Sequence, residues 1–339
     1  MATSGPKAFV TGGTGMVGSH LIERLVKEGY RVKALVRSKS DTSLLDPLGV
    51  EKCLGDITDP PDALKPMVAD CGYVFHIAAM VDDWASREDM YRANVTATQN
   101  LMDACMGGPL KRFMMIGSMA VLGMGTQLDL DETAPYVYTG DNYNYTKIEA
   151  EKLVTRYAKE KKFPVVTLRP PYIYGPRDRQ FFSRVFTTLR DRSFIYIGDG
   201  NNLFTIVFAK NLVEALVLVA KAPASCEGQI YHITDGAAIT RRELVEMICD
   251  LVGYEKPTRS VPVGLAKALC PVFEFIGKLL KKTPRLNKFR LKFMVPHMTF
   301  KIDKARRELG YNPPHKQRDA LKESILWYKE HHPEVLSKA

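Results

Sequence analysis

The sequence predicts an α/β fold, a doubly wound parallel sheet with helices on both faces, followed by a smaller C-terminal lobe. Two observations predict it. Short apolar segments alternate with amphipathic helical segments up to about residue 178, and a glycine-rich turn directly follows the first apolar segment. Because neighbouring parallel strands need a crossover helix between them, such alternation is typical of a parallel sheet covered by helices.

Five apolar segments are the candidate strands of this sheet. They are Lys7–Val10, Arg31–Val36, Tyr73–Ala78, Phe113–Gly117 and Val165–Arg169. Apolar residues with helical spacing lie between them, among them Leu21, Leu25, Val26, Val95, Leu101 and Ala104. Ligands of such sheets bind beyond the carboxyl ends of the strands, so functional residues are expected there.

The pattern changes in the second half of the chain. We expect helices at Phe181–Leu189, Asn211–Lys221 and Arg241–Leu251, a strand and turn at Ile195–Gly200, and a strand at Gly228–Ile233. Residues 1–178 are therefore assigned mainly to a nucleotide-binding domain and residues 179–339 mainly to a substrate lobe. Strands near 205–210 and 228–234 are expected to return to the first domain.

The amino-acid composition indicates which class of protein this is. The 339 residues are 45% hydrophobic and 25% charged, as in ordinary globular proteins. The six cysteines form no C-x-x-C pair and show no metal-ligand spacing, so we expect thiols in a reducing compartment and no metal site. With no signal peptide and no apolar run long enough to span a bilayer, a cytoplasmic protein is expected.

The net charge of +10 is concentrated in one part of the chain. Residues 256–318 contain 16 Lys or Arg and 3 Asp or Glu. A basic lobe can meet nucleic acid, an anionic lipid surface or an anionic substrate. No nucleic-acid-binding motif is present, so no nucleic-acid partner is expected; if the lobe did bind DNA, the affinity would depend steeply on salt.

The glycine-rich turn has the spacing of a dinucleotide-binding loop. Gly12, Gly15 and Gly18 follow a strand and precede a helix that begins near Met16. Glycine allows the tight turn and the close approach of backbone to a pyrophosphate, and the helix N-terminus offers free N–H groups to the anion. The alternative is a purely structural turn. We expect a Rossmann-type fold with cofactor contacts from Gly12, Thr14, Gly15, Met16, Val17 and Gly18.

Residues at the ends of the next two strands bear on the choice of cofactor. Arg37 stands where NAD-binding sites usually place a carboxylate for the ribose hydroxyls. A guanidinium pairs with a 2′-phosphate, so NADP(H) is preferred, NAD(H) remains possible, and a solvated arginine is the alternative. Asp56 and Ile57 are further expected cofactor contacts. The Asp56 carboxylate can accept a hydrogen bond from the adenine amino group, and the alternative is an aspartate that simply belongs to a turn.

The chemistry is expected from Tyr143 and Lys147, which form a Y-x-x-x-K pattern. On a helix these two side chains share a face, and an ammonium there would lower the pKa of the phenol, so that it can exchange a proton with an alcohol or ketone. Tyr145 is the rival, but Glu149 one turn on would raise its pKa. Taken alone, such a pattern also occurs as an exposed surface pair.

Ser118 follows the candidate strand Phe113–Gly117 and is expected at the ligand edge of the sheet. Its hydroxyl can orient the substrate oxygen and stabilise developing charge. The alternative is a buried serine bonded to its own backbone. A hydrolase triad does not fit, because Ser118 lacks a nucleophile-elbow context. The protein could instead be a redox sensor that binds a dinucleotide without catalysis. Such a sensor would need only the nucleotide loop, so the presence of Ser118, Tyr143 and Lys147 together disfavours it.

Taken together, these motifs resemble the extended short-chain dehydrogenase/reductases along nearly the whole chain. The matching segments are Thr11–Gly18, Gly55–Asp56, Val74–Ala79, Asn94–Asn100, Ser118–Gly123, Tyr143–Lys147 and Leu168–Pro176. The resemblance implies catalytic roles for Ser118, Tyr143 and Lys147, and cofactor contacts from Ala78, Pro170, Tyr143 and Lys147. It also implies that Asn94 lies near the active site, unless it only braces backbone, and that a homodimer pairs helices near Val95 and Tyr143.

The subfamily is suggested by two further regions. Relatives that act on nucleotide sugars carry G-D-G-x-x-x-R-D-F, whereas this chain has Phe204 in place of the arginine, which disfavours an epimerase or dehydratase. The tail, including Gly228–Thr234 and Phe300–Pro313, resembles 3β-hydroxysteroid and sterol-4-carboxylate dehydrogenases and reductases of long-chain β-keto acids. A large apolar alcohol or ketone is the expected substrate, and a dihydroflavonol-type reductase of smaller ketones is the alternative.

The segment 265–293 combines apolar and basic residues. Leu265, Leu269, Val272, Phe273, Ile276 and Leu280 have helical spacing within Leu265–Lys282, and Pro271 is expected to kink this helix or start a second one. A basic amphipathic segment can lie in a membrane interface. It can equally pack over the substrate cleft with its charged face in water.

Overall fold

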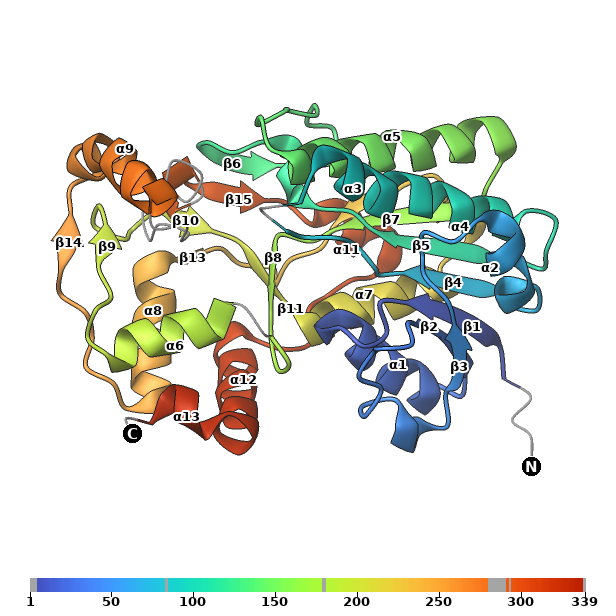
Figure 1. The fold of residues 1–339 in the computed structure, drawn as a ribbon, viewed down its shortest axis with the longest axis horizontal. Coiled ribbons are helices and arrows are strands. Elements are labelled where there is room, and N and C mark those ends of the chain that lie inside the picture. Colours follow the sequence, from blue (N-terminus) through green and yellow to red (C-terminus); the bar gives the residue numbers. More distant parts are fainter. Residues whose placement is uncertain (1–4, 83–84, 179–180, 280–290, 293, 338–339) are drawn as a thin grey trace.

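The computed structural model describes residues 5–82, 85–178, 181–279, 291–292 and 294–337 (Figure 1). Its largest element is a seven-stranded sheet, parallel throughout, in the order β12-β7-β5-β4-β1-β2-β3. The strands are β1 (Lys7–Thr11), β2 (Arg31–Val36), β3 (Glu51–Leu54), β4 (Tyr73–His76), β5 (Arg112–Ile116), β7 (Val165–Arg169) and β12 (Ile230–His232). The predicted parallel sheet is confirmed.

Helices cover both faces of this sheet (Figure 1). One face carries α1 (Met16–Lys27), α7 (Ala209–Lys221) and α11 (Asp303–Leu309), and the other carries α2 (Pro61–Val68), α4 (Ala97–Cys105) and α5 (Asn142–Lys161). Side chains alternate between the two layers: Ala8 and Val10 of β1 pack with α1 and α7, whereas Phe9 packs with α2, α4 and α5. Strands buried on both faces explain why their sequences read as continuous apolar runs.

The strand order reverses beside β1. From there the chain winds outward through β2 and β3 on one side and through β4, β5 and β7 on the other. Such a reversal leaves a crevice beyond the carboxyl ends of β1 and β4. Thr11 and His76 end these two strands, and Ile116 ends β5 next to them.

A second lobe is built on a smaller sheet of order β13-β10-β15-β6. Its strands are β6 (Gln127–Leu130), β10 (Leu203–Phe204), β13 (Ile239–Thr240) and β15 (Met298–Phe300). Helices α6 (Phe181–Arg190), α8 (Arg241–Val252), α12 (Gln317–His331) and α13 (Pro333–Leu336) enclose a separate apolar cluster. β9 (Tyr196–Ile197) pairs with β14 (Ser260–Val261).

The two strands that were expected to return to the first domain pair in different sheets. β12 joins the large sheet beside β7, whereas β11 (Ile206–Phe208) pairs with β8 (Tyr172–Tyr174) in a two-stranded sheet of its own. The remaining elements are short: α3 (Arg87–Tyr91), the π-helical turn η2 (Arg92–Thr96) and the 3-10 turns η1 (Asp46–Leu48), η3 (Met119–Leu122) and η4 (Ala224–Cys226).

The segment with mixed apolar and basic character forms α9 (Val263–Leu279). The helix continues through Pro271, so the proline does not start a second helix. Leu280–Lys282 and residues up to 290 lie outside the described part, as do Phe293 and the side chain of Ile276. In the described ranges, no helix has both the length and the apolar character needed to cross a bilayer.

Candidate active site

The glycine loop joins β1 to α1 in a conformation that only glycine permits. Gly12 has φ +71°, and the Gly15 N–H donates to the Gly12 carbonyl at 3.0 Å. A Cβ atom on Gly18 would lie 2.1 Å from that same carbonyl oxygen, and a Cβ on Gly12 would lie 2.8 Å from the Ala78 nitrogen. The glycine spacing therefore allows the helix, the strand and the loop after β4 to approach one another closely.

The N-terminus of α1 is free to receive an anion. Gly15 is its N-cap, no side chain caps the first turn, and no acidic residue lies there. Thr14 and Met16 flank Gly15 and are half-buried, while Val17 faces the apolar core. Exposed N–H groups and the helix dipole suit the pyrophosphate of a dinucleotide, so these residues fit such a cofactor.

Arg37 and Asp56 face each other across the ends of β2 and β3. Hydrogen bonds from the Thr58 hydroxyl and N–H, at 2.7 and 2.9 Å, hold the pKa of Asp56 below its usual value, with a smaller contribution from the positive charge of Arg37. A turn therefore holds the Asp56 carboxylate, whose contact with adenine stays a prediction, and Ile57 packs against the apolar cluster behind it. Arg37 is exposed and keeps its guanidinium toward solvent.

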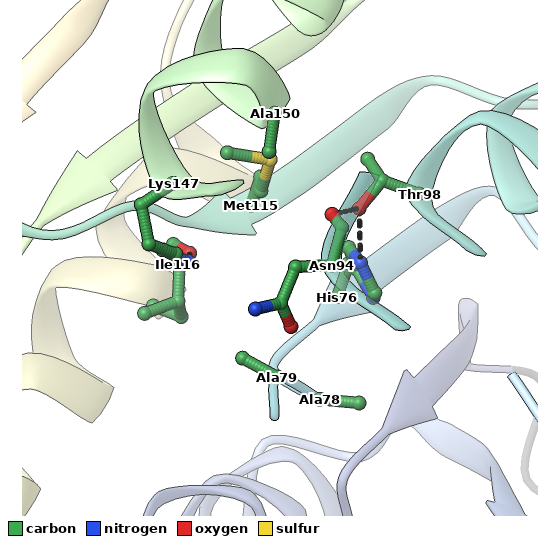
Figure 2. Close-up of a pocket in the computed structure, with 9 residues that line it drawn as sticks. All are labelled: His76, Ala78, Ala79, Asn94, Thr98, Met115, Ile116, Lys147 and Ala150. Atoms are coloured by element: carbon green, nitrogen blue, oxygen red, sulfur yellow. Dashed lines mark hydrogen bonds between the residues drawn. The ribbon is translucent and has the colours of Figure 1, made fainter. Parts of the chain in front are cut away.

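His76 links the glycine loop to the helical layer. Its Nδ1 lies 2.9 Å from the Thr11 hydroxyl. Its Nε2 lies 2.9 Å from the Thr98 hydroxyl, a contact drawn in Figure 2. Thr98 donates its proton to the Asn94 carbonyl, so it must accept from His76, which assigns the proton to Nε2. Burial lowers the pKa of His76 to about 3, so the ring is neutral and acts as a fixed connector.

Lys147 reaches into a small pocket between α5 and the ends of β4 and β5 (Figure 2). The side chain is 4% exposed, and its Nζ donates to the Ile116 carbonyl at 2.6 Å. Burial lowers the pKa of Lys147 to about 8, although the negative charge of Glu151 opposes that shift. The pocket also contains Ala78, whose N–H donates to the Thr11 hydroxyl at 3.2 Å.

Tyr143 lies one helical turn before Lys147, in the first turn of α5, with its phenol beside the Ser118 hydroxyl. Ser118 also accepts from the Ala120 N–H at 3.1 Å and caps the turn η3. Burial raises the pKa of Tyr143, and the Ser118 hydroxyl opposes this only in part. The expected lowering by Lys147 was wrong for this state of the protein, because burial of the phenol outweighs any attraction to an ammonium that is itself bonded to the Ile116 carbonyl.

The rival Tyr145 points elsewhere. Its ring lies 6.1 Å from that of Tyr138 and 6.3 Å from that of Tyr91, and the Arg87 guanidinium stands 4.9 Å above it. Tyr145 is therefore an anchor for the segment around Arg87. Of these two tyrosines, Tyr143 is the one whose phenol lies beside the Ser118 hydroxyl.

Two buried asparagines position the loops around Tyr143. The Asn94 amide accepts from the Met80 N–H at 2.7 Å and donates to the Met80 carbonyl at 3.0 Å and to the Thr146 hydroxyl at 3.2 Å. It thus braces backbone, which was one of its two expected roles, and it does so from the π-helical turn η2. Such turns are frequent at functional sites.

The role of Asn144 was not predicted from the sequence. Its amide donates to the Ala120 carbonyl at 2.6 Å and to the Val137 carbonyl at 3.0 Å, and it accepts from the Thr139 N–H at 3.1 Å. These bonds tie the segment after Ser118 to the first turn of α5. The sequence offered one signal, an asparagine, which is a weak helix former, within the predicted helical motif Tyr143–Lys147. Its complete burial depends on tertiary packing, so the sequence alone did not reveal its role.

A buried ion pair supports the back of the site and was also missed. Arg169 and Glu151 are 2% and 0% exposed, and two N–H groups of Arg169 donate to one Glu151 oxygen at 2.9 and 2.7 Å. Pro170 follows Arg169 and its carbonyl accepts from the Met119 N–H at 3.0 Å, so it lies beside the Ser118 segment. The structure thus brings Ser118, Tyr143, Lys147, Ala78 and Pro170 to one edge of the sheet.

The side chains gathered at the site indicate which chemistry it can perform. In the described part of the chain, no group of three or more His, Cys, Asp or Glu side chains is arranged to hold an ion. Its functional groups are a phenol, an ammonium and a hydroxyl beside an anion-binding helix N-terminus. These groups can bind a dinucleotide and exchange a proton with an oxygen placed next to it.

Comparisons with known proteins agree with this arrangement. The model of the NAD dependent epimerase/dehydratase family matches residues 8–234. A 4-hydroxy-2-methyl-3-oxo-4-farnesyl-3,4-dihydroquinoline-1-oxide ketoreductase of Stigmatella aurantiaca is 31% identical over 90% of this chain and 91% of its own length. A 2-alkyl-3-oxoalkanoate reductase of Stenotrophomonas maltophilia is 31% identical over 91% and 94%. A 3-beta-hydroxysteroid dehydrogenase of Mycolicibacterium neoaurum is 28% identical over 95% and 91%.

Solved structures share the whole fold. The crystal structure of gox2253 has a TM-score of 0.80 and 29% identity, and covers 96% of this chain and 98% of its own. The dTDP-glucose 4,6-dehydratase DesIV of Streptomyces venezuelae, with NAD and TYD bound, has a TM-score of 0.77 and 23% identity, and covers 98% of this chain and 100% of its own. At that identity the second likeness concerns the fold alone.

Proposed function

Because the chain belongs to the NAD dependent epimerase/dehydratase family, and within it to the extended short-chain dehydrogenase/reductases, we propose that it is an NADP(H)-dependent oxidoreductase that interconverts a secondary alcohol and a ketone on a large apolar substrate. The observation that carries the proposal is the placement of the Tyr143 phenol beside the Ser118 hydroxyl, one turn before Lys147 at the ligand edge of the sheet.

The side chains divide the proton chemistry among them. A bound nicotinamide supplies or takes up the hydride. Tyr143 donates its proton to the substrate oxygen during reduction, and the Ser118 hydroxyl orients that oxygen. Burial keeps the phenol protonated at neutral pH, which is the acid form that reduction needs. An alkoxide forming on the substrate is more basic than a phenolate, so this transfer is favourable even with a raised tyrosine pKa.

Lys147 and the asparagines hold this arrangement. The Lys147 ammonium lies on the same helix face as Tyr143 and stabilises negative charge on the phenolate that proton transfer leaves behind. Asn94 fixes the loop after β4 against α5, and Asn144 fixes the Ser118 segment against the same helix. Proton donor and substrate oxygen therefore meet in a preformed geometry.

The preference for NADP(H) rests on Arg37. Its exposed guanidinium stands at the end of β2, beside the crevice, and suits a 2′-phosphate. Replacing Arg37 with Ala should weaken NADPH binding by about tenfold or more, as for the loss of one charge-assisted pair, and should leave NADH binding unchanged. Lys39→Ala is the matched control, an exposed basic residue two positions on. Equal weakening of both cofactors would contradict the proposal.

An apolar substrate is supported by the second lobe. Phe204 is 5% exposed and packs in the apolar cluster of that lobe, so this position offers no charge to a diphosphate. The relatives named above act on a farnesylated quinoline oxide, on 2-alkyl-3-oxoalkanoates and on 3β-hydroxysteroids. We take a sterol-like alcohol or a long-chain β-keto acid as the substrate class.

A substrate panel tests this proposal. Sterols, long-chain β-keto acids, flavonoid-like ketones, short ketones and nucleotide sugars are each incubated with NADPH or NADP⁺, and the absorbance of the reduced cofactor is followed. For the nucleotide sugars the products are also separated by chromatography, because epimerisation and dehydration cause no net change in the cofactor. The proposal expects the highest kcat/KM for a sterol or a long-chain keto acid. Preferential turnover of flavonoid-like or short ketones would replace it with a reductase of small ketones, and turnover of nucleotide sugars would refute it.

A further inference from the structure

The helix α9 exposes an apolar face of unusual extent. Its large apolar side chains have exposed fractions of 51% (Leu265), 37% (Leu269), 53% (Val272), 40% (Phe273), 69% (Phe275) and 74% (Leu279). These are six of the sixteen large apolar side chains that the described residues expose, gathered on one helix of 17 residues. Folded proteins rarely leave such a contiguous patch to water unless something binds there.

The opposite side of α9 attaches the helix to the second lobe. Ala266 and Cys270 are 1% exposed and pack in a small cluster with Leu291, Ile197 and Val261. β9 and β14, which supply Ile197 and Val261, thus support the helix from beneath, and Figure 1 shows α9 at the outer end of the second lobe. The exposed row is therefore presented on a fixed helix.

Exposed basic residues lie on α9 and in the segments that pack against it. Lys267 on α9 is exposed, and so are Arg259 and Lys292, each within two residues of a side chain that packs against the helix. A second copy of the chain would bring the same positive charge to such a contact, which disfavours a symmetric dimer through this face.

From the exposed apolar face of α9 and the exposed basic residues near this helix, we infer that α9 docks the protein on the surface of an anionic lipid membrane. Val272, Phe275 and Leu279 enter the boundary between headgroups and acyl chains, and the basic side chains meet the lipid phosphates. The inference rests on the proposed function in one respect, since a large apolar substrate resides in such a membrane. It adds a surface and a partner that the oxidoreductase chemistry does not require.

Vesicle co-sedimentation of the full chain tests the inference. The protein should sediment with vesicles of phosphatidylcholine and phosphatidylglycerol, sediment less with phosphatidylcholine alone, and bind less as salt is raised. The triple variant Val272→Ser, Phe275→Ser, Leu279→Ser should bind the anionic vesicles about tenfold more weakly or worse. Lys267→Glu with Lys292→Glu should weaken binding to anionic vesicles and not to neutral ones.

The matched control is Leu54→Ser with Leu326→Ser, which removes exposed apolar side chains outside α9, 67% and 47% exposed. This control should bind vesicles like wild type, and all variants should keep the wild-type melting temperature and NADPH affinity. Vesicle binding that is absent in wild type, or unchanged in the triple variant, would overturn the inference. So would a dimer, seen by size-exclusion chromatography, that the triple variant converts to monomer. Because vesicle binding needs no substrate, its result is independent of whether the proposed reaction is found.

Discussion

Replacing Lys147 with Met should stabilise the protein while it abolishes turnover. Burial lowers the pKa of Lys147 to about 8, from 10.5 in the unfolded chain. Since a tenfold change in proton affinity corresponds to about 1.4 kcal/mol, keeping this ammonium charged in the fold costs about 3 kcal/mol below pH 8. Loss of the 2.6 Å hydrogen bond to the Ile116 carbonyl offsets about 1–2 kcal/mol. A net gain of about 1–2 kcal/mol remains for the variant at pH 7.

The pH dependence identifies the cause of this gain. The folded protein releases the Lys147 proton near pH 8, whereas the unfolded chain keeps it until near 10.5. Between these pH values the unfolded chain binds more protons than the folded protein, so the free energy of unfolding of wild type rises with pH. The difference in stability between Lys147→Met and wild type therefore becomes smaller. At pH 9.5 the advantage of the variant should have fallen by about 2 kcal/mol relative to pH 7.

Urea unfolding at pH 7 and pH 9.5 measures both effects. Lys152→Met is the matched control, because Lys152 is exposed on the same helix and pairs only with Glu149 at the surface. Its stability should stay within about 0.5 kcal/mol of wild type at both pH values. An advantage of Lys147→Met that is the same at both pH values, or a variant less stable than wild type at pH 7, would refute the reasoning.

Three further outcomes are expected. Gly18→Ala should abolish NADPH binding in a fluorescence titration, because its Cβ would lie 2.1 Å from the Gly12 carbonyl; unchanged affinity would contradict the loop geometry. His76→Gln should lower the free energy of unfolding at pH 7 by about 1–3 kcal/mol. Between pH 6.5 and 4 the unfolded wild-type chain binds a proton at His76, whereas the folded protein, with the pKa of His76 lowered to about 3, does not. Wild type therefore loses stability as the pH falls through this range, and His76→Gln should lose less. Asn94→Leu should reduce kcat more than NADPH affinity, since it frees Met80 from α5; an unchanged kcat would remove its positioning role.

The elements of the large sheet were accessible to sequence reasoning because their signals are local. Arg31–Val36 and Val165–Arg169 are strands with the bounds that their apolar runs predict, and α1 begins at Met16 as the glycine spacing predicts. A strand buried on both faces has to be apolar throughout, and a dinucleotide loop needs glycine where backbone atoms nearly touch. Both constraints are visible in a single sequence.

The second lobe and the supporting contacts were less accessible because they depend on tertiary partners. β10 and β13 have only two residues each, too short for any period to appear. The pairing of Arg169 with Glu151 joins a strand to a helix, and neither residue stands out among the other charged residues of the chain.

The electrostatics of the site were predicted only in part. Helical spacing correctly placed Tyr143 and Lys147 one turn apart, but the direction of the tyrosine shift depends on how deeply the phenol is buried. Spacing reports which side chains are neighbours, and it carries no information on desolvation. The same limit applies to His76, whose two threonine partners lie on β1 and α4.

The most direct measurement compares Tyr143→Phe with wild type, using the best substrate of the panel and NADPH. In Tyr143→Phe, kcat should fall by about a hundredfold or more, as expected when a general acid is removed, while NADPH affinity measured by fluorescence should stay within about threefold. Tyr145→Phe should retain wild-type turnover, because that ring packs between Tyr91 and Tyr138. Turnover that survives in Tyr143→Phe would contradict the assignment of the phenol as proton donor.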